Sequence, residues 1–390
     1  MKQLAAVIVA VAVLLTGCTS APEPAPATTA APRPVPPPID PVQQHADDRL
    51  SVMSLDEKIA SMIMLHVPGL DPSGIGGTAA AYGLGGVILM GDNIPDPASV
   101  LADWAPVIRG ETGLPVLIAT DQEGGIVQRI PDGGPSAAEL RYLDPSAARA
   151  AFQERAGMLA ADGISVNFGI VADVAGDPSS FIFDRSMGST PVDAAARVGE
   201  AVAGEAGLVL STLKHFPGHG VAPGDSHSGI PGTPMGLDEW RAGHAEPFQA
   251  GIDAGAEVVM FGHLQFDAVD PVPATLSLAW HELLRDELGF DGITITDDLN
   301  MLEDSGRPEY ADPVRNAVLA VAAGNTMLLY VQGVDVPAVV AGIHAAVDAG
   351  TLDESLIDDA ARRLLVVRRE LSGETGRFVH CFEECRAVIE

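Results

Sequence analysis

The chain has 390 residues, 47% of them hydrophobic, and a formal charge of −31 from 53 acidic and 22 basic side chains. This charge disfavours binding to nucleic acid, which depends on neutralising phosphates, and to an anionic membrane surface. The length and the hydrophobic fraction are enough to bury a large core, in one large domain or two ordinary ones.

Residues 1–18 read MKQLAAVIVAVAVLLTGC and have the features of an export signal. Lys2 gives a positive start, and the apolar run Leu4–Leu15 has the length of a signal-peptide core but is too short for an ordinary membrane span. The ending Leu15–Cys18 resembles a bacterial lipobox, which implies a lipoprotein signal peptide over residues 1–17 and lipid attached to Cys18. A plain secretory signal with an incidental cysteine is the alternative.

Residues 18–45 are rich in alanine, proline and threonine, a composition that cannot form a core and tends to polyproline II. We expect them to be a disordered tether in front of a folded domain at residues 46–372, with a tail at 373–390. The expected protein is exported and lipid-anchored at the outer face of the cytoplasmic membrane. It touches the membrane only through that anchor.

The tail contains Cys381 and Cys385 in the sequence HCFEEC. In an exported protein a local disulfide or two free thiols are the simpler readings. A metal site that includes His380 is the third possibility.

Eight apolar runs alternate with amphipathic, alanine-rich segments after residue 47. Most runs are unbroken, as expected for parallel strands that are buried on both faces. The expected strands are Ser61–His66, Gly86–Met90, Pro115–Thr120, Val166–Ala172, Val209–Lys214, Val258–His263, Gly292–Thr296 and Thr326–Val331. The expected helices are a short one after Ser54 and Pro97–Arg109, Pro145–Ala161, Pro191–Ala206, Asp238–Ala254, Ser277–Leu288, Pro313–Ala323, Val336–Ala349 and Asp353–Leu371.

This alternation predicts a single α/β domain, a (β/α)8 TIM-type barrel. A doubly wound open sheet is the alternative, but no strand is followed by GxGxxG. The glycine-rich stretches Gly74–Gly77 and Gly83–Gly86 are expected in turns.

In a barrel, reactive groups lie where strands end at their carboxyl side. The residues at these ends are polar or charged: Asp92 and Asn93, Asp121–Glu123, Asp173, Lys214 and His215, His263, and Asp297 and Asp298. Asp297 could act as a nucleophile, a base or a metal ligand, whereas Asp298 fits a helix N-cap. Carboxylates at 121 and 123, followed by two glycines, suit paired sugar hydroxyls or are simply solvated acids.

The stretch Ser211–His227 carries the densest group of titratable side chains and is too rich in glycine and proline to be a regular helix. In an extended loop, Asp225 and His227 face the same way, so the carboxylate can orient the imidazole as a general acid/base. An exposed turn with a stray histidine is the alternative. His215 and His219 have a zinc-ligand spacing, but Pro217 breaks the helix it needs, so no metal or other cofactor is expected.

Several motifs, in this order along the chain, resemble those of glycoside hydrolase family 3, in its β-N-acetylglucosaminidase branch. They are DQEGG at 121–125, VNF and AD within 166–173, DRSMG at 184–188, KHFPGHG at 214–220, DSH at 225–227, PATLS at 273–277, LRDELGFDG at 284–292 and TDDLNM at 296–301. The resemblance implies a single barrel without the second domain of larger members. The chain departs from the pattern at Ile126, Met187 and Gly262–Asp267, which bears on substrate preference.

The resemblance also implies roles for individual residues. Asp297 corresponds to the catalytic nucleophile, His227 to the general acid/base and Asp225 to its partner. The residues expected to bind the sugar are Asp121, Arg129, Arg185, Lys214, His215 and His263.

These roles imply a retaining exo-β-N-acetylglucosaminidase that acts on GlcNAc–MurNAc fragments of peptidoglycan through a covalent glycosyl-aspartate. The alternatives are a β-glucosidase, a phosphorolytic family 3 enzyme, and an inactive, lipid-anchored carbohydrate-binding protein. The expected partner is a carbohydrate and not a nucleic acid, and the protein is expected to be a monomer.

Overall fold

The computed structural model describes residues 40–111 and 113–374. Cys18, Cys381, Cys385 and the signal sequence lie outside these residues, so their expected roles stay predictions. In the part that is described, no helix has the length and apolar character needed to cross a membrane.

Eight parallel strands form the barrel, in sequence order around the ring. They are β1 (Ile63–His66), β2 (Gly86–Leu89), β3 (Leu117–Thr120), β6 (Val166–Val171), β7 (Leu210–Phe216), β9 (Val258–Phe261), β12 (Ile293–Thr296) and β13 (Leu328–Tyr330). β1 pairs with both β2 and β13, and a bridge between Ile295 and Met327 joins β12 to the β13 end. The predicted eight strands and the TIM-type barrel are therefore confirmed.

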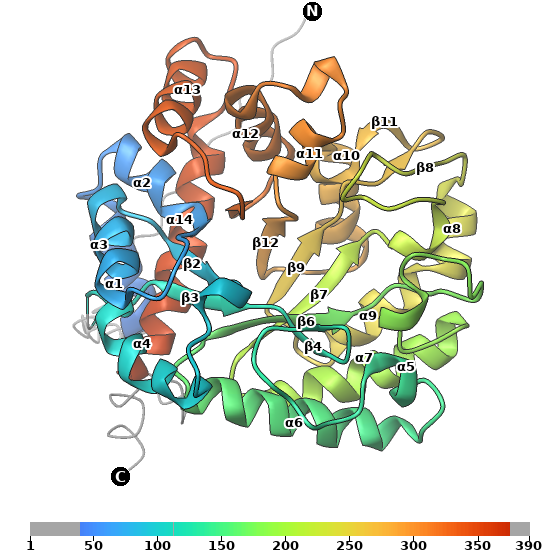
Figure 1. Cartoon of the computed structure of the whole chain (residues 1–390). Coiled ribbons are helices and arrows are strands. Elements are labelled where there is room, and N and C mark those ends of the chain that lie inside the picture. The colour runs from blue at the N-terminus through green and yellow to red at the C-terminus, as the bar shows by residue number, and fades with distance from the viewer. Residues whose placement is uncertain (1–39, 112, 375–390) are drawn as a thin grey trace, which may run out of the picture. The chain divides into compact units, whose positions relative to one another are not determined.

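Helices lie outside the ring of strands (Figure 1). They are α1 (Pro41–Leu50), α2 (Leu55–Ser61), α3 (Pro72–Tyr82), α4 (Leu101–Arg109), α5 (Ala137–Leu140), α6 (Pro145–Ala161), α7 (Pro191–Glu205), α8 (Leu237–Gly243), α9 (Ala245–Asp253), α10 (Leu278–Glu282), α11 (Asn300–Asp304), α12 (Pro313–Ala323), α13 (Val336–Asp348) and α14 (Glu354–Arg369). Short strands extend the loops at β4 (Gln122–Gly124), β5 (Val127–Gln128), β8 (Gly232–Thr233), β10 (Gln265–Phe266) and β11 (Asp270–Pro273).

The first glycine-rich stretch was expected in a turn, and this expectation was wrong. Gly74–Gly77 lie in helix α3, because Asp71 caps its first turn, Pro72 follows, and Gly83 ends it in the left-handed region at φ 68°. A Cβ at Gly76 would lie 2.6 Å from the Val107 carbonyl oxygen, so glycine here allows α3 to pack close to α4.

The folded domain also begins earlier than the expected residue 46. Asp40 caps α1 by accepting a hydrogen bond from the Val42 amide at 2.9 Å. Ala46 is then buried in a small apolar cluster with Leu114 and Leu365, so α1 packs as part of the domain.

Aromatic side chains fill the core beneath the end of β7. The ring of Phe216, the last residue of β7, lies 5.0 to 5.9 Å from the rings of Phe248, Phe261, Trp240 and Trp280. Trp240 Nε1 donates to the Pro217 carbonyl oxygen at 2.7 Å. The loop after β7 therefore begins from a closely packed aromatic cluster.

A buried carboxyl group, Glu205 at the end of α7, gives a testable pH dependence. It is fully buried, its Oε1 accepts from Asn167 Nδ2 at 2.6 Å, and burial raises its pKa from 4.5 to about 8. The folded protein therefore binds a proton here that the unfolded chain has lost above its lower pKa. Stability from this group is present below pH 4.5 and decreases as pH rises through about 8.

We expect Glu205→Gln to remove this dependence, because the amide stays neutral. The variant should gain at least about 1.4 kcal/mol over the wild type between about pH 5 and about pH 9. Thermal unfolding across this range measures the difference. Glu200→Gln, on the exposed side of the same helix beside Arg149, is the control and should keep the wild-type slope. An unchanged slope in Glu205→Gln would refute the assignment.

Candidate active site

A network of ion pairs joins the carboxyl ends of neighbouring strands. Lys214 Nζ lies 2.9 Å from Asp121 Oδ1 and 2.7 Å from Glu123 Oε1. Arg129 donates to the other oxygen of Asp121 at 2.8 Å. Arg185 binds Glu123 with two nitrogens, at 2.9 and 2.7 Å. The carboxyl-terminal part of β7 and the segments after β3 and β6 are thus held at one place.

Burial and pairing fix the charges of this network. Burial alone would raise the pKa of Asp121, but Lys214 and Arg129 beside it hold that pKa well below its usual range. Burial would lower the pKa of Lys214, but Asp121 and Glu123 raise it overall. All these groups stay ionised near neutral pH. Since each carboxylate oxygen has two lone pairs, Asp121 can still accept hydrogen bonds from sugar hydroxyls.

Asp173, just beyond β6, holds the next part of the site. Its Oδ2 lies 2.8 Å from His215 Nδ1, and its Oδ1 accepts from the backbone amide of His219 at 2.6 Å. His215 Nε2 in turn lies 3.3 Å from Arg185 Nη2. One buried carboxylate therefore fixes the orientation of His215 and the start of the following loop.

This loop, residues 217–228, carries the predicted acid/base pair. His227 Nδ1 lies 2.7 Å from Asp225 Oδ1, and the same oxygen accepts from the His227 amide at 2.9 Å. Burial would raise the pKa of Asp225, but the hydrogen bonds and the charge of His227 hold it below its ordinary value. The side chains are 60% exposed for His227 and 40% for Asp225. An ionised Asp225 can stabilise a protonated His227 whose Nε2 points away from it.

Glycine allows the base of the loop to pass close to its neighbours. A Cβ at Gly220 would lie 1.9 Å from the Val174 carbonyl oxygen. Lys214–His215 and Phe216–Pro217 are cis peptide bonds. The close approach at Gly220 shows that the base of the loop fits tightly against the segment after β6, whereas Asp225 and His227 at its tip are exposed.

Asp297 follows β12 directly, as predicted, and its Oδ1 accepts from the Asp298 amide at 2.8 Å. Burial would raise the pKa of Asp297, but interaction with His215 and His263 holds it below its ordinary value. The carboxylate is therefore ionised, as a nucleophile must be.

The adjacent Asp298 has a structural task. Its Oδ1 accepts from the amides of Asn300 and Val331, at 3.1 and 3.0 Å. It thus joins the start of α11 to the end of β13, but Leu299 and not Asp298 stands at the N-cap position of α11, so the predicted N-cap was placed one residue too early.

His263 differs from the expected sugar ligand. It is 1% exposed, its Nε2 lies 2.9 Å from the Asp298 carbonyl oxygen, and its Nδ1 lies 2.9 Å from Thr275 Oγ1. Both ring nitrogens have protein partners, so we assign His263 to supporting the backbone after β12. Its pKa is lowered mainly by burial, while the charge of Asp297 raises this pKa and that of His227 lowers it. The two candidate catalytic groups are therefore within electrostatic reach of one histidine.

The structure brings together Asp121, Arg129, Arg185, Lys214 and His215, which were predicted to bind the sugar. The sequence suggested that Glu123 could bind sugar hydroxyls, whereas in the structure it is buried and pairs with Arg185 and Lys214. Asp173 was noted at a strand end, but no role was assigned to it. Within residues 40–111 and 113–374, no cluster of three or more His, Cys, Asp or Glu side chains could hold a metal ion.

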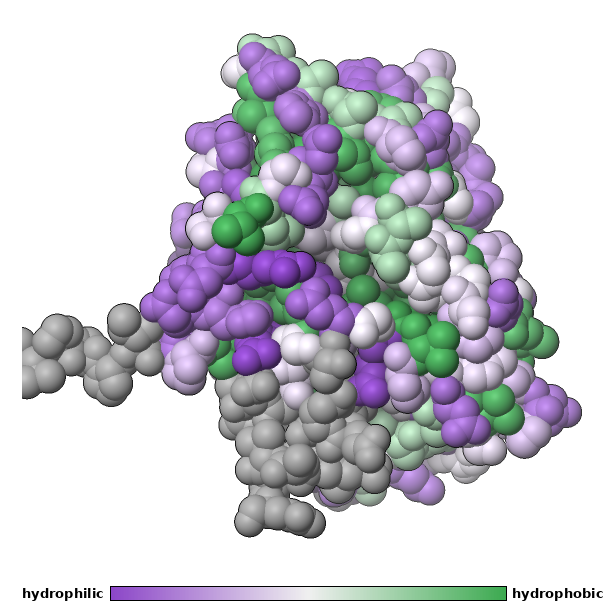
Figure 2. All heavy atoms as spheres, turned by 90° about the vertical axis from the view of Figure 1, so that its left-hand side faces the viewer, coloured by the Kyte–Doolittle hydropathy of each residue, from purple (hydrophilic) through white to green (hydrophobic). Residues whose placement is uncertain are grey.

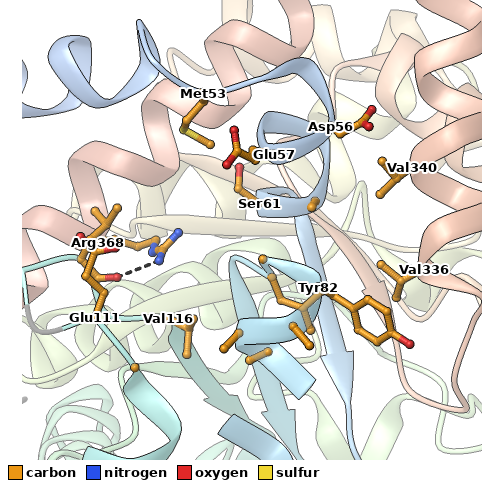
Figure 3. Close-up of a pocket in the computed structure, with 18 of the residues that line it drawn as sticks. Met53, Asp56, Glu57, Ser61, Tyr82, Glu111, Val116, Val336, Val340 and Arg368 are labelled. Carbon is orange, nitrogen blue, oxygen red and sulfur yellow. Dashed lines mark hydrogen bonds between the residues drawn. The ribbon is translucent and has the colours of Figure 1, made fainter. Parts of the chain in front are cut away.

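An open hollow of about 1030 Å³ lies elsewhere on the domain, near the amino ends of β1 to β3. Figure 3 shows Tyr82 of α3, Val336 and Val340 of α13, and Asp56 and Glu57 of α2 around it. On this face of the molecule, apolar and hydrophilic residues are interspersed (Figure 2). Neither the ion-pair network nor Asp225, His227 or Asp297 lines the hollow, so we place the candidate active site at the carboxyl ends of the strands.

The sequence matches a family model described as "Glycosyl hydrolase family 3 N terminal domain" over residues 54–367. This chain belongs to glycoside hydrolase family 3. The matched range spans the whole barrel, from the capped start of α2 to the last turns of α14.

Individual family 3 proteins are similar to this chain in sequence and structure. A "Beta-hexosaminidase" of Stenotrophomonas maltophilia is 37% identical over 228 residues, which cover 55% of this chain and 68% of the relative. "Beta-hexosaminidase LpqI" of Mycobacterium tuberculosis is 32% identical over 93% of this chain and 96% of its own length. The solved structure of M. tuberculosis LpqI has a TM-score of 0.74 and covers 82% of this family 3 chain and 95% of the LpqI chain.

A glycoside hydrolase family 3 β-N-acetylglucosaminidase from Paenibacillus sp. has the same TM-score of 0.74, at 32% identity. The alignment covers 82% of this family 3 chain and 63% of the Paenibacillus chain. The Paenibacillus protein therefore extends beyond the part that is aligned with this chain.

Proposed function

We propose that this family 3 enzyme is a retaining β-N-acetylhexosaminidase that removes terminal β-linked N-acetylglucosamine, with peptidoglycan fragments of the GlcNAc–MurNAc type as its substrate. The observation that carries the proposal is the combination of Asp297 at the end of β12 with an array of buried, paired charges and an Asp225–His227 pair on the loop after β7. The names of the two bacterial relatives support a hexosaminide as substrate, and the similar Paenibacillus β-N-acetylglucosaminidase supports the choice of N-acetylglucosamine.

In the first step, a carboxylate oxygen of Asp297 forms a bond to the anomeric carbon. The bond from that carbon to the leaving oxygen breaks, and protonated His227 gives its proton to the leaving oxygen. In the second step, His227 takes a proton from water, and the water oxygen attacks the anomeric carbon from the face that the leaving group has vacated. The bond between that carbon and Asp297 breaks, and the carboxylate is released. Two inversions leave the anomeric configuration retained.

The charge of the acid/base group bears on the leaving sugar. Most retaining glycosidases use a second carboxylate in this position. A histidine is neutral after it gives up its proton, so it does not repel a leaving sugar that carries its own carboxylate. This favours N-acetylmuramic acid, whose lactyl group is anionic, as the leaving group.

Product analysis tests the proposal. We expect proton NMR on a GlcNAc–MurNAc fragment to show the β-anomer of free GlcNAc first, followed by mutarotation. An aryl N-acetylglucosaminide should be cleaved at least about 100-fold faster than the matching glucoside, since a site built for a polar group rejects the analogue that lacks it.

Three outcomes would favour the alternatives. Faster cleavage of the glucoside would indicate a β-glucosidase. GlcNAc 1-phosphate as the main product in phosphate buffer would indicate phosphorolysis. Binding without any release of chromophore would indicate an inactive carbohydrate-binding protein.

A further inference from the structure

The connection between β6 and α7 presents one aromatic ring to the acid/base loop. In this connection Ile182 is fully buried with Val171 and Ala175, and the ring of Phe183 lies 3.8 Å from the Arg141 guanidinium carbon. Phe181 has no place in this apolar cluster and remains 37% exposed. Ile182 and Phe183 thus hold the segment against the domain, and the Phe181 ring is free to contact the acid/base loop.

Phe181 contacts both ends of the loop. Its ring centre lies 5.4 Å from that of His219, which is buried at the base, and 5.6 Å from that of His227 at the tip. The Phe181 and His227 rings meet edge to face, at 65°. The guanidinium carbon of Arg185, in the buried charge network, lies 5.8 Å from the same ring.

The base and the tip of the loop are held in different ways. Backbone bonds to Asp173 and Trp240 fix the base. At the tip, Asp225 and His227 bond to each other, and Gly224 has a φ of 111°. Among the described residues outside the loop, Phe181 is the one whose ring contacts that of His227.

We propose that Phe181 is a positioning residue, an aromatic support that holds His227 over the bound sugar. The face of a phenyl ring is negative and attracts the positive edge of an imidazole, more strongly when the imidazole is protonated. The support therefore acts most on the acid form of His227, which must donate to the leaving oxygen. This inference rests on the proposed role of His227 as the general acid.

A series of aryl β-N-acetylglucosaminides tests the support, because leaving groups differ in their need for a proton. We expect Phe181→Leu to lower kcat/KM about 3- to 10-fold for the phenyl glycoside and less than about 2-fold for the 2,4-dinitrophenyl glycoside. Phe181→Tyr keeps the ring and should restore the phenyl glycoside rate. Phe183→Leu removes a ring from the same segment and should show no dependence on the leaving group.

The outcomes separate this proposal from the proposed function. An equal loss for all leaving groups in Phe181→Leu would mean that the ring packs on the leaving group or only stabilises the fold, and would overturn the proposal. No loss at all would overturn it too. His227→Gln is measured on the same series. If it shows a strong leaving-group dependence and Phe181→Leu does not, only the role of Phe181 fails. If His227→Gln shows none, the acid assignment fails, and the role of Phe181 fails with it.

Discussion

Asp297→Ala is expected to lower kcat for an aryl β-N-acetylglucosaminide by at least about 10⁴-fold, because it removes the group that forms the covalent intermediate. In the structure this carboxylate ends a fully buried strand and is held by the amide of the next residue. Its lowered pKa keeps it ionised, so the loss should not depend on pH near neutrality. The fold should survive, since the carboxylate does not bridge two elements.

Two measurements identify the nucleophile directly. A slow fluorinated analogue of the aryl glycoside should add the mass of one sugar to the wild type, on the peptide that contains Asp297, and nothing to Asp297→Ala. Added azide should partly rescue the variant and yield the α-glycosyl azide, because attack from solvent inverts the centre once.

The neighbouring carboxylate provides a matched control. Asp298→Asn removes the negative charge but keeps an oxygen that can accept from the same two backbone amides, so it should preserve the fold and leave activity within about 10-fold of the wild type. If Asp297→Ala were labelled to the same extent as the wild type, or if only Asp298→Asn lost the label, Asp297 would not be the nucleophile.

Elements with local start signals could be predicted from the sequence at residue accuracy. Helices α6 and α12 have the predicted bounds, because each begins with proline behind a capping aspartate, Asp144 and Asp312. Helix α3 was missed because its glycines contradict helix propensity, and its packing against α4 outweighs that preference. The predicted helix at 238–254 is interrupted at His244, which ends α8 and precedes α9.

In the candidate site, too, the sequence predicts positions along the chain but not the contacts that tertiary packing makes. Strand ends identify Asp121, Lys214 and Asp297, because a barrel collects those positions at one rim. Sequence does not say which way a side chain faces. His263 was therefore expected to bind sugar, although its two ring nitrogens are hydrogen-bonded to Thr275 and to the backbone of Asp298. No pattern marks Phe181, whose contacts with the loop depend on tertiary packing.

The second large effect is expected from His227→Gln, and its size should depend on the leaving group. A glutamine amide cannot supply a proton, so kcat/KM should decrease about 10² to 10⁴-fold for the phenyl glycoside. For the 2,4-dinitrophenyl glycoside, whose leaving group needs no proton, the decrease should stay within about 10-fold. The exposure of His227 argues that this substitution leaves the fold intact.

The same variant should lose the base that activates water, so the glycosyl-enzyme should accumulate. A burst of dinitrophenol is then expected, followed by slow turnover that azide accelerates, with the β-glycosyl azide as product. An α-glycosyl azide from the Asp297 variant and a β-glycosyl azide from the His227 variant would place the two residues on opposite faces of the sugar ring.

His219→Gln is the control, since this histidine belongs to the same loop but is buried and bonded to Ser226 Oγ at 3.1 Å. Burial lowers its pKa to about 4, so it is neutral near pH 7 and cannot be the proton donor there. Its replacement should change the rate by a similar factor for every leaving group. If the leaving-group dependence appeared in His219→Gln and not in His227→Gln, the acid would lie at the buried base of the loop instead of its exposed tip.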